Sequence, residues 1–419
     1  MFIVSARYLF LCDENFSILD NQGFVFDEKI LEFGTAKHLR QKYPQAKIIP
    51  TPPNSLILPA FINSHTHLEF SANSYTLHFG KFLPWLKSVM AHRQNLSQEA
   101  KDALLLKTLQ GMLRSGTGTV GEISSFGSDL APCVGASKRG MRIVFFNEIL
   151  GANEAGLEEK KQDFLRRFEA SMTCKSELFI PALSLHAPYS THKKLAHFAL
   201  EFAKKNRLLV STHFLESRAE ILWLWGAEGG FRWAGLEGGG FKKWLSSLSQ
   251  NPSPSYTPAE FIGLFKGLRT LFTHCVYLKE WALLDPKLHA ITHCAFSNRL
   301  LSQGTFALKR ALKSGLNVHL GTDGLSSNIS LSMLDELRAN LLIHADFDLE
   351  FLAKKLLLMA TLYPARALNL NLGTLEEGKE ADFSVFTVGE CDKAQLPLQF
   401  ILNAKGVEKI FIRGRSCEF

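Results

Sequence analysis

The chain lacks the features that mark a membrane protein or a disulfide-stabilised protein. No stretch of its 419 residues approaches the roughly 18 consecutive apolar residues that a transmembrane helix needs. Its 7 cysteines form no Cys-x-x-Cys pair, and their odd number leaves at least one unpaired. This usage predicts a reducing, cytoplasmic compartment. The apolar start, MFIVSARYLFL, is interrupted by Arg7 and has no small-residue cleavage site, so we interpret it as a strand.

The chain also lacks a large excess of charge of one sign. The chain has 47 Lys and Arg against 40 Asp and Glu, a net charge of +7, with no block of about five or more basic residues. We therefore expect neither a nucleic-acid partner nor a membrane partner. A small-molecule partner fits this mildly basic surface. A homodimer is compatible with the sequence, which does not decide the oligomeric state.

What the sequence does contain is a long alternation of short apolar runs and segments with helical periodicity. This pattern is typical of βα repeats around a parallel sheet. We expect strands at 56–63, 116–123, 142–149, 178–186, 208–213, 269–274, 288–293 and 316–322. Helices are expected between them, at 99–114, 155–172, 192–206 and 303–314. Eight strands joined by helices favour a (β/α)8 barrel, and an open doubly wound sheet is the alternative.

The two ends of the chain have β character and flank this repeat region. The predicted fold class is α/β, a distorted (β/α)8 TIM barrel with a small β-sandwich domain made from both chain ends. Residues 1–57 and 371–419 are expected to form the β domain, and 58–370 the barrel. Residues 220–262 look like an insertion, with four of the six tryptophans and several turn-forming stretches. A loop of this length commonly carries part of an active site.

Metal-binding residue types stand at the ends of the predicted strands, which all meet at one mouth of a barrel. His65 and His67 are two residues apart on extended backbone and point the same way. A lone His-x-His is more often structural, but His213 and Asp323 follow later strands in the same manner. Three nitrogens and one carboxylate oxygen suit zinc or ferrous iron and leave a position for water. The sequence thus predicts one divalent metal ion, Zn or Fe(II), held by these four residues.

Two further residues are candidates for acid–base chemistry at this mouth. Glu216 follows His213 by three residues, so a helical turn would bring its carboxylate into the mouth, where it can carry protons to a leaving nitrogen. The alternative is a solvated carboxylate at a helix start. His274 is a candidate to orient the water or the developing oxyanion, and a buried structural histidine is the alternative.

Candidate substrate contacts come from several segments. His186 ends the predicted strand 178–186, and we expect it to contact the substrate because the metal already has four ligands. Trp85 suits stacking on a planar ring, although it equally suits helix packing. Asn298 follows a predicted strand end and shapes the pocket, and Arg93 adds a cation on another loop. Glu216 also faces the substrate in this interpretation.

These motifs, in this order, resemble the amidohydrolase superfamily over nearly the whole chain. The matching segments are LILPAFINSHTH, THFLES, THCAFSN, LGTDG and LGTLEEGKEADFSVF. His-x-x-Glu after the fifth strand and a histidine after the sixth resemble the aminopurine and cytosine deaminase branch, which uses one metal. The segment LSLHAPY has no bridging lysine, which argues against a binuclear, dihydroorotase-like site.

Within that superfamily, AFINSHTHLEFS, STHFLES, FSNRLLS and TDGLSSNISLSMLDELRA are similar to the aminofutalosine deaminase family of menaquinone synthesis. The resemblance implies hydrolytic deamination of the adenine ring of 6-aminodeoxyfutalosine. Glu216 would protonate the ring nitrogen and then the ammonia, while Asp323 and His274 would accept or steer the proton of the water. There are two departures: Ala295 replaces a common Pro, and Arg93-Gln94 stands where methylthioadenosine deaminases have a ribose-binding Glu.

Three alternatives remain open from the sequence. The first is a methylthioadenosine or adenosylhomocysteine deaminase, the second is another aminopurine or triazine hydrolase, and the third is a metal-free scaffold protein. The benzoate of 6-aminodeoxyfutalosine distinguishes this substrate from methylthioadenosine, because a flat anion needs an aromatic wall and a cation in the protein. The expected wall residues are Trp223, Trp225, Phe231 and Trp233, with Arg232, Arg93 and Arg299 as cations.

Overall fold

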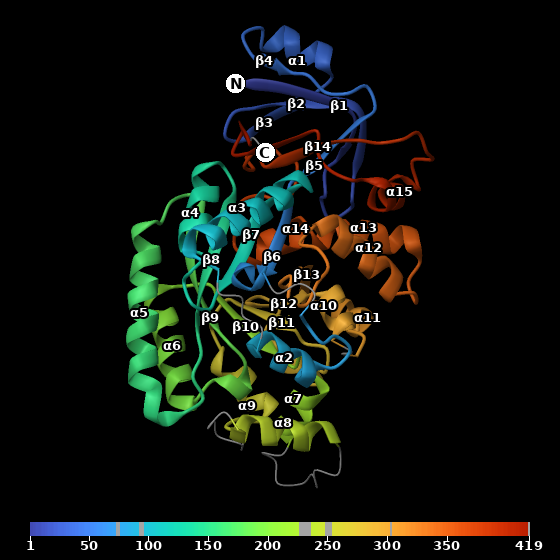
Figure 1. The fold of residues 1–419 in the computed structure, drawn as a ribbon. Coiled ribbons are helices and arrows are strands. Elements are labelled where there is room, and N and C mark those ends of the chain that lie inside the picture. Colours follow the sequence, from blue (N-terminus) through green and yellow to red (C-terminus); the bar gives the residue numbers. More distant parts are fainter. Residues whose placement is uncertain (73–75, 92–95, 226–235, 248–253, 302–303, 418–419) are drawn as a thin grey trace.

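The chain folds into two sheets. One is parallel and is surrounded by helices, and the other contains both parallel and antiparallel pairs. The computed structural model describes residues 1–72, 76–91, 96–225, 236–247, 254–301 and 304–417. A parallel barrel sheet forms the centre, and a separate sheet built from both ends of the chain lies above it in Figure 1. The predicted barrel with a small β domain is therefore confirmed. No helix in these ranges is long and apolar enough to cross a membrane.

The barrel sheet has eight parallel strands in the order β13-β12-β11-β10-β9-β8-β7-β6. They are β6 (Phe61–Thr66), β7 (Thr117–Ser124), β8 (Arg142–Ile149), β9 (Phe179–Leu185), β10 (Val210–Phe214), β11 (Thr270–His274), β12 (His289–His293) and β13 (Asn317–Leu320). The ends of the sheet meet, because Ser64 Oγ donates to the carbonyl of Leu320 at 2.8 Å. The amide of Asp323 likewise donates to the carbonyl of His65 at 3.0 Å, which brings the two chain-distant strand ends together.

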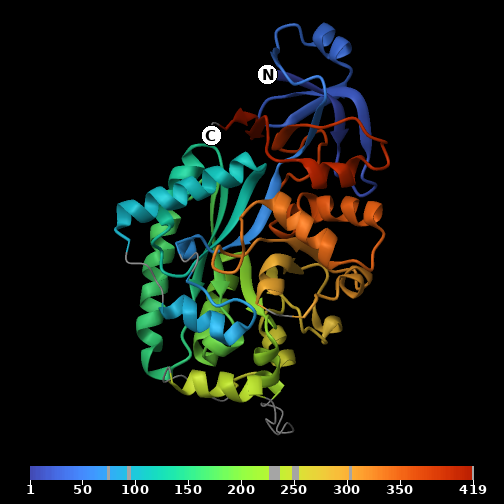
Figure 2. The ribbon, with the colours of Figure 1, turned by 45° about the vertical axis from the view of Figure 1, so that its right-hand side comes forward.

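Helices surround this sheet, on its outside and across the ends of its strands (Figures 1 and 2). They are α2 (Phe82–Ala91), α3 (Gln98–Arg114), α4 (Leu130–Lys138), α5 (Leu157–Thr173), α6 (Lys193–Asn206), α7 (Arg218–Trp225), α8 (Leu236–Ser247), α9 (Pro258–Leu264), α10 (Ala295–Leu300), α11 (Leu308–Lys313), α12 (Met333–Ile343), α13 (Leu349–Met359) and α14 (Leu362–Ala367). Short 3-10 turns lie at Leu68–Phe70, Glu154–Gly156, Pro188–Ser190 and Trp281–Leu283. Capping follows the sequence, since the Ser97 side chain accepts from the amide of Ala100 at the start of α3. The helix expected at 303–314 is shorter, because α11 starts only at Leu308.

The second sheet joins the two chain ends in the order β16-β15-β14-β5-β1-β2-β3, with β4 paired to β1. Its elements are β1 (Phe2–Phe10), β2 (Ile18–Phe26), β3 (Ile30–Gly34), α1 (Ala36–Lys42), β4 (Lys47–Ile49), β5 (Ser55–Pro59), β14 (Phe383–Thr387), α15 (Leu396–Asn403), β15 (Lys409–Ile412) and β16 (Arg415–Ser416). Stacked and edge-on phenylalanines from both ends, including Phe26 and Phe383 with ring centroids 5.0 Å apart, fill its core.

The single strand expected at 56–63 is in fact two strands of different sheets. β5 pairs antiparallel with β14, whereas β6 pairs parallel with β7. The change of partner occurs at Ala60, whose amide donates to the carbonyl of Asp382. Both halves are apolar because both are fully buried, so the sequence shows one continuous run.

A buried ion pair ties the two sheets together. Arg142, on β8, is 1% exposed and binds the carboxylates of Asp382 and Glu380, which lead into β14. Asp382 also accepts a hydrogen bond from the amide of Arg413 at 2.7 Å. The side chains of Arg142 and Asp382 have almost no contact with solvent, so losing the charge of Asp382 leaves Arg142 with only the partly exposed Glu380 as a partner.

Replacing Asp382 with Asn is expected to lower the free energy of unfolding by about 3 kcal/mol, because the Arg142 guanidinium then stays buried with less compensation. Urea titration measures the change. Asp20→Asn is the matched control, since Asp20, on β2 of the same sheet, pairs with Lys393 but about half of each side chain is exposed. That control should change stability by less than about 1 kcal/mol. Equal effects of the two substitutions would contradict the role given to the buried pair.

Candidate active site

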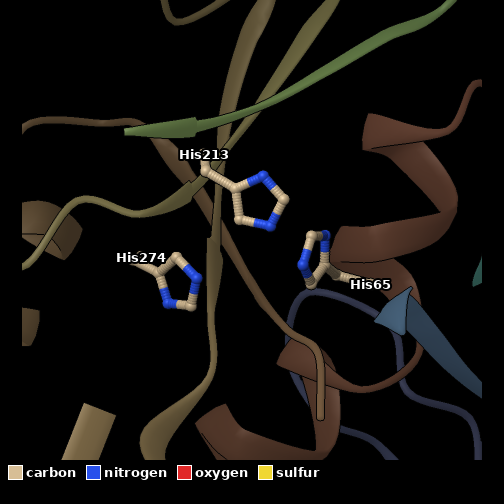
Figure 3. Close-up of side chains that lie close together, drawn as sticks. All are labelled: His65, His213 and His274. Carbon is tan, nitrogen blue, oxygen red and sulfur yellow. The ribbon is translucent and has the colours of Figure 1, made fainter. Parts of the chain in front are cut away.

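Four of the predicted residues converge at the carboxyl ends of the barrel strands. His65 and His67 come from the end of β6, His213 from β10, and Asp323 follows β13. Nε2 of His67 lies 3.0 Å from Nε2 of His213, and 3.6 Å from Oδ1 of Asp323. Nε2 of His65 lies 3.9 Å from the same carboxylate oxygen. Figure 3 shows the rings of His65 and His213 together with His274 around one space.

Asp323 is held so that one oxygen faces the histidines. Its Oδ2 accepts from the hydroxyls of Ser297 at 2.7 Å and Ser327 at 2.8 Å, which leaves Oδ1 directed at His67 and His65. Its backbone is in the left-handed region, with φ of 60°. Burial opposes ionisation, but His67 and the other nearby histidines outweigh it and hold the pKa of Asp323 below its usual value. The site thus presents an ionised carboxylate.

Two of the histidines, His65 and His213, offer neutral nitrogens to the same space. Burial, followed by the neighbouring His67, lowers the pKa of His65 well below its usual value. Burial and His65 do the same to the pKa of His213. Nε2 of His65 is buried without a hydrogen-bond partner among the described residues, which is uncommon for a buried polar atom. Neutral imidazoles and an ionised carboxylate are the forms that bind a metal, so this donor set fits a divalent ion.

Glu216 and His274 lie beside this set. Nε2 of His274 is 3.8 Å from Oε1 of Glu216, and both side chains are almost fully buried. Burial, with Asp323 and Glu220, raises the pKa of Glu216 well above its usual value and so favours the protonated form of this group. The carboxylate of Glu220 accepts from the amides of Leu215 and Glu216 and fixes the turn after β10.

A cavity of about 230 Å³ opens directly onto these groups. It is lined by His67, Phe70, Trp85, Leu86, Val89, Met90, Ser125, Phe126, Glu148, Leu150, His186, Tyr189, Ser190, His213, Glu216, Trp244, His274, Asp323 and Ser326. The lining residues Trp85 and Met90 come from α2 and Trp244 from α8, which lie across the strand ends in Figures 1 and 2. The indole Nε1 of Trp85 donates to the carbonyl of Ser326 at 2.6 Å, which fixes the ring at the rim.

Only some of the predicted substrate contacts line the cavity. His186 and Trp85 line the cavity, whereas Asn298 lies behind His274 and does not line it. Arg93 falls outside the described residues, so the structure gives it no position. No lysine or arginine is among the described residues that line the cavity.

The insertion contributes to the cavity through a residue that was not singled out. Trp244 of α8 lines it, while Trp223 is 2% exposed and absent from the lining. Trp225 lies under the ammonium of Lys279, 4.1 Å from the ring centroid, and is likewise not a lining residue. Phe231, Arg232 and Trp233 lie outside the described residues. Arg299 is exposed on α10 and does not line the cavity.

Several supporting residues were missed by the sequence argument. Glu336 of α12 accepts from the amides of Ala295 and Phe296 and so anchors the start of α10. Glu122 accepts from the Thr66 hydroxyl and the amide of Leu68, which holds the segment carrying His65 and His67. Both carboxylates are completely buried. An acidic residue within an apolar run, as in TVGEIS, was the available signal.

Comparison with known proteins gives a consistent result. The Amidohydrolase family model matches residues 56–417. The aminodeoxyfutalosine deaminase of a Nitratiruptor species is 38% identical over 405 residues, covering 96% of each chain. The adenosine deaminase of Helicobacter pylori is 39% identical over 418 residues, covering 99% of this chain and 98% of its own. The crystal structure of Helicobacter pylori aminofutalosine deaminase in complex with methylthio-coformycin is similar with a TM-score of 0.88 at 38% identity, over 99% of this chain and 100% of that one.

The chain therefore belongs to the amidohydrolase family, a family of typically metal-dependent hydrolases. Within this family it is a hydrolytic deaminase, as its motifs led us to expect. The buried carboxyl group of Glu216 lies beside the cluster of histidines and Asp323.

Proposed function

We propose that the protein removes the amino group from the adenine ring of 6-aminodeoxyfutalosine by hydrolysis. The supporting observation is that Glu216, His274 and Asp323 place their proton-carrying atoms within 4.8 Å of one another on one cavity. The similarity to aminodeoxyfutalosine deaminase over 96% of the chain supports the substrate. The reaction consumes one water and releases one ammonia, and it places the proposed enzyme in menaquinone synthesis.

We propose that His65, His67, His213 and Asp323 hold one divalent ion, zinc or ferrous iron. Such an ion supplies an activated water molecule at neutral pH. Asp323, which is itself one of these ligands, and the neighbouring His274 accept or steer the proton that the water loses. Glu216 donates a proton to the ring nitrogen next to the carbon under attack. As a carboxylate it then takes the proton of the hydroxyl group added to that carbon and passes it to the amino group, so that the carbon–nitrogen bond breaks and ammonia leaves. The proton that Asp323 and His274 accepted from the water finally returns to Glu216. Loss of ammonia leaves a carbonyl on the ring in place of the amino group.

The substrate is proposed to enter between α2 and the end of β9. Trp85 offers a flat face to the purine, and His186 offers an imidazole that Ser190 fixes through its hydroxyl at 2.5 Å from Nδ1. Glu148 and Ser125, joined by a 2.6 Å hydrogen bond, add polar groups on the same wall. These groups suit the hydroxyls of a ribose.

Deamination of methylthioadenosine or adenosylhomocysteine is the second candidate. The observation that favours it is the apolar outer lining, formed by Phe70, Leu86, Val89, Met90 and Phe126, with no lysine or arginine among the described lining residues. Such a wall suits a thioether as well as an aromatic ring.

The assay that tests the proposal is ammonia release from a panel of adenine nucleosides, together with the change in ultraviolet absorption as the aminopurine becomes an oxopurine. We expect one ammonia for each nucleoside consumed. A protein that binds a divalent ion but deaminates none of the panel would contradict the proposed activity.

Removal of the ion is expected to lower the rate of ammonia release strongly, because a bound divalent ion lowers the pKa of its water toward neutrality. Treatment with a chelator should lower the rate at least about tenfold and should also lower the thermal midpoint, since a ligand bound only by the folded state stabilises it. Adding zinc or ferrous iron should restore both. Full activity in protein shown to be free of divalent ions would refute the metal-dependent mechanism.

Three further points belong to the proposal. We propose the expected division, with residues 1–57 and 371–419 in the β domain and 58–370 in the barrel with its insertion at 220–262. The first boundary moves to Ala60, because β5 stays paired with β14 up to Pro59. We also propose that the enzyme works in the cytoplasm. A homodimer is proposed as its assembly, and light scattering of the purified protein measures this.

A further inference from the structure

A row of buried polar side chains runs from the cavity into the wall of the barrel. Nδ1 of His274 is 3.0 Å from Oδ1 of Asn298, on α10. Nδ2 of Asn298 is 3.4 Å from Nδ1 of His293, at the end of β12. Nε2 of His293 is 3.1 Å from Nε2 of His344, which follows α12. All four residues are at most 3% exposed.

Each member of this row decides which nitrogen of the next one carries hydrogen. A neutral imidazole has one N–H donor and one acceptor nitrogen, and an amide donates from nitrogen and accepts at oxygen. Because Oδ1 of Asn298 faces His274, Nδ1 of His274 must be the donor. The amide then donates to Nδ1 of His293, so Nε2 of His293 donates to His344. The row can be reversed only if every member reverses together.

The surroundings keep the row neutral. Burial, with His344 next, lowers the pKa of His293 well below its usual value, and burial lowers the pKa of His344 to about 4. The ring of Phe306 stacks on His293 with centroids 4.8 Å apart. A protonated His293 would present two donors and break its bond from Asn298. An amide does not readily pass a proton on, so the row orients His274 and does not conduct protons to the surface.

We propose that Asn298, His293 and His344 are positioning residues that hold His274 in the tautomer with hydrogen on Nδ1, so that Nε2 faces Glu216 and the cavity as an acceptor. Nε2 of His274 is buried, 3.8 Å from Glu216, and has no hydrogen-bond partner among the described residues. The backbone of His274 is in the left-handed region, with φ of 72°, which aims the ring at this space.

The consequence for catalysis rests on the proposed function. An acceptor at Nε2 can take or steer a proton from the attacking water, whereas the other tautomer would point an N–H at the same place. This also explains why Asn298 does not line the cavity although it follows a strand end. It acts on the reaction through His274.

Nitrogen-15 NMR of the zinc-loaded, histidine-labelled protein tests the tautomer directly, with His274→Gln used to assign the signals. We expect a protonated Nδ1 and an unprotonated Nε2 in the parent protein. Asn298→Asp should keep this pattern, because a carboxylate still accepts from Nδ1. Asn298→Leu should give a mixture of tautomers. Hydrogen on Nε2 of His274 in the parent, or an unchanged pattern in Asn298→Leu, would overturn the inference.

A kinetic comparison separates positioning from mere stability. His293→Phe should lower kcat about 10-fold to 100-fold with KM within about threefold, because the acceptor is mispositioned while binding is kept. His289→Phe is the matched control, since His289 is a buried histidine at the opposite end of β12, bonded to Phe265 and Asp285. It should change neither the His274 signals nor kcat by more than about threefold. Equal losses of kcat in both variants, with unchanged His274 signals, would contradict the proposal.

The two hypotheses can fail separately. If the parent protein deaminates no nucleoside, the proposed function is wrong, but the NMR pattern still decides whether the row sets the tautomer. If deamination is observed and the pattern is reversed, only the positioning role is wrong.

Discussion

Replacing Glu216 with Gln is expected to lower kcat by about 100-fold to 10,000-fold while the metal content stays at the parent level. Burial raises the pKa of the Glu216 carboxyl group well above its usual value, which favours the protonated form that donates to the ring nitrogen. Glutamine has nearly the same shape and keeps a hydrogen-bonding group, but it cannot transfer that proton. Single-turnover rates and metal analysis of the same preparation measure the two effects.

Glu220→Gln is the matched control for this prediction. Glu220 is also a buried carboxylate of the same segment, but it does not line the cavity and its oxygens accept from backbone amides. Glutamine retains one accepting oxygen, so we expect kcat within about tenfold of the parent. A loss of metal in Glu216→Gln would show that Glu216 is a ligand or a structural support, and the proton-transfer role would be wrong.

The second large effect is expected for Asp323→Asn, which should reduce kcat/KM more than about 100-fold and also reduce the bound metal. The substitution removes the negative charge that faces His65 and His67 while keeping the size of the side chain. The hydroxyls of Ser297 and Ser327 can still bond to an amide oxygen, so the fold should be retained. Metal content and circular dichroism distinguish loss of the site from loss of the fold.

Asp129→Asn is the matched control, because it makes the same substitution at a buried aspartate away from the cavity. Asp129 is completely buried but does not line the cavity. Burial, with Glu69 next, raises the pKa of Asp129 to about 8, so it is largely protonated at neutral pH and an amide resembles it. This variant should keep its metal and its activity. Near-normal turnover of Asp323→Asn would refute the assignment of Asp323 as a ligand.

The parallel barrel could be predicted because each strand is short, apolar and separated from the next by a helical pattern. The β8 strand at Arg142–Ile149 matches the expected range, and β12 differs by one residue. The division at Ala60 could not be predicted, because it depends on which partner each half finds. β5 pairs with β14, more than 300 residues later, and no local signal in LILPAFIN distinguishes it from β6.

The cluster of His65, His67, His213 and Asp323 could be predicted for a related reason. The ends of parallel strands meet in a barrel whatever the loops do, so strand position alone brings these residues together. The surroundings of the cluster depend on side-chain packing. Asn298 was expected to face the substrate, yet a turn of α10 directs its amide to His274 instead. Trp244 reaches the cavity only because α8 lies across the strand ends, which no periodicity reveals.

The candidate substrates are separated by the ratio of kcat/KM for 6-aminodeoxyfutalosine to the values for methylthioadenosine, adenosylhomocysteine and adenosine. All four are measured on one metal-loaded preparation at equal substrate concentrations. Discrimination must come from the far end of the substrate, because the adenine ring and ribose are shared. We expect the highest kcat/KM for 6-aminodeoxyfutalosine. Equal or faster turnover of methylthioadenosine would contradict it and would leave a general aminopurine nucleoside deaminase.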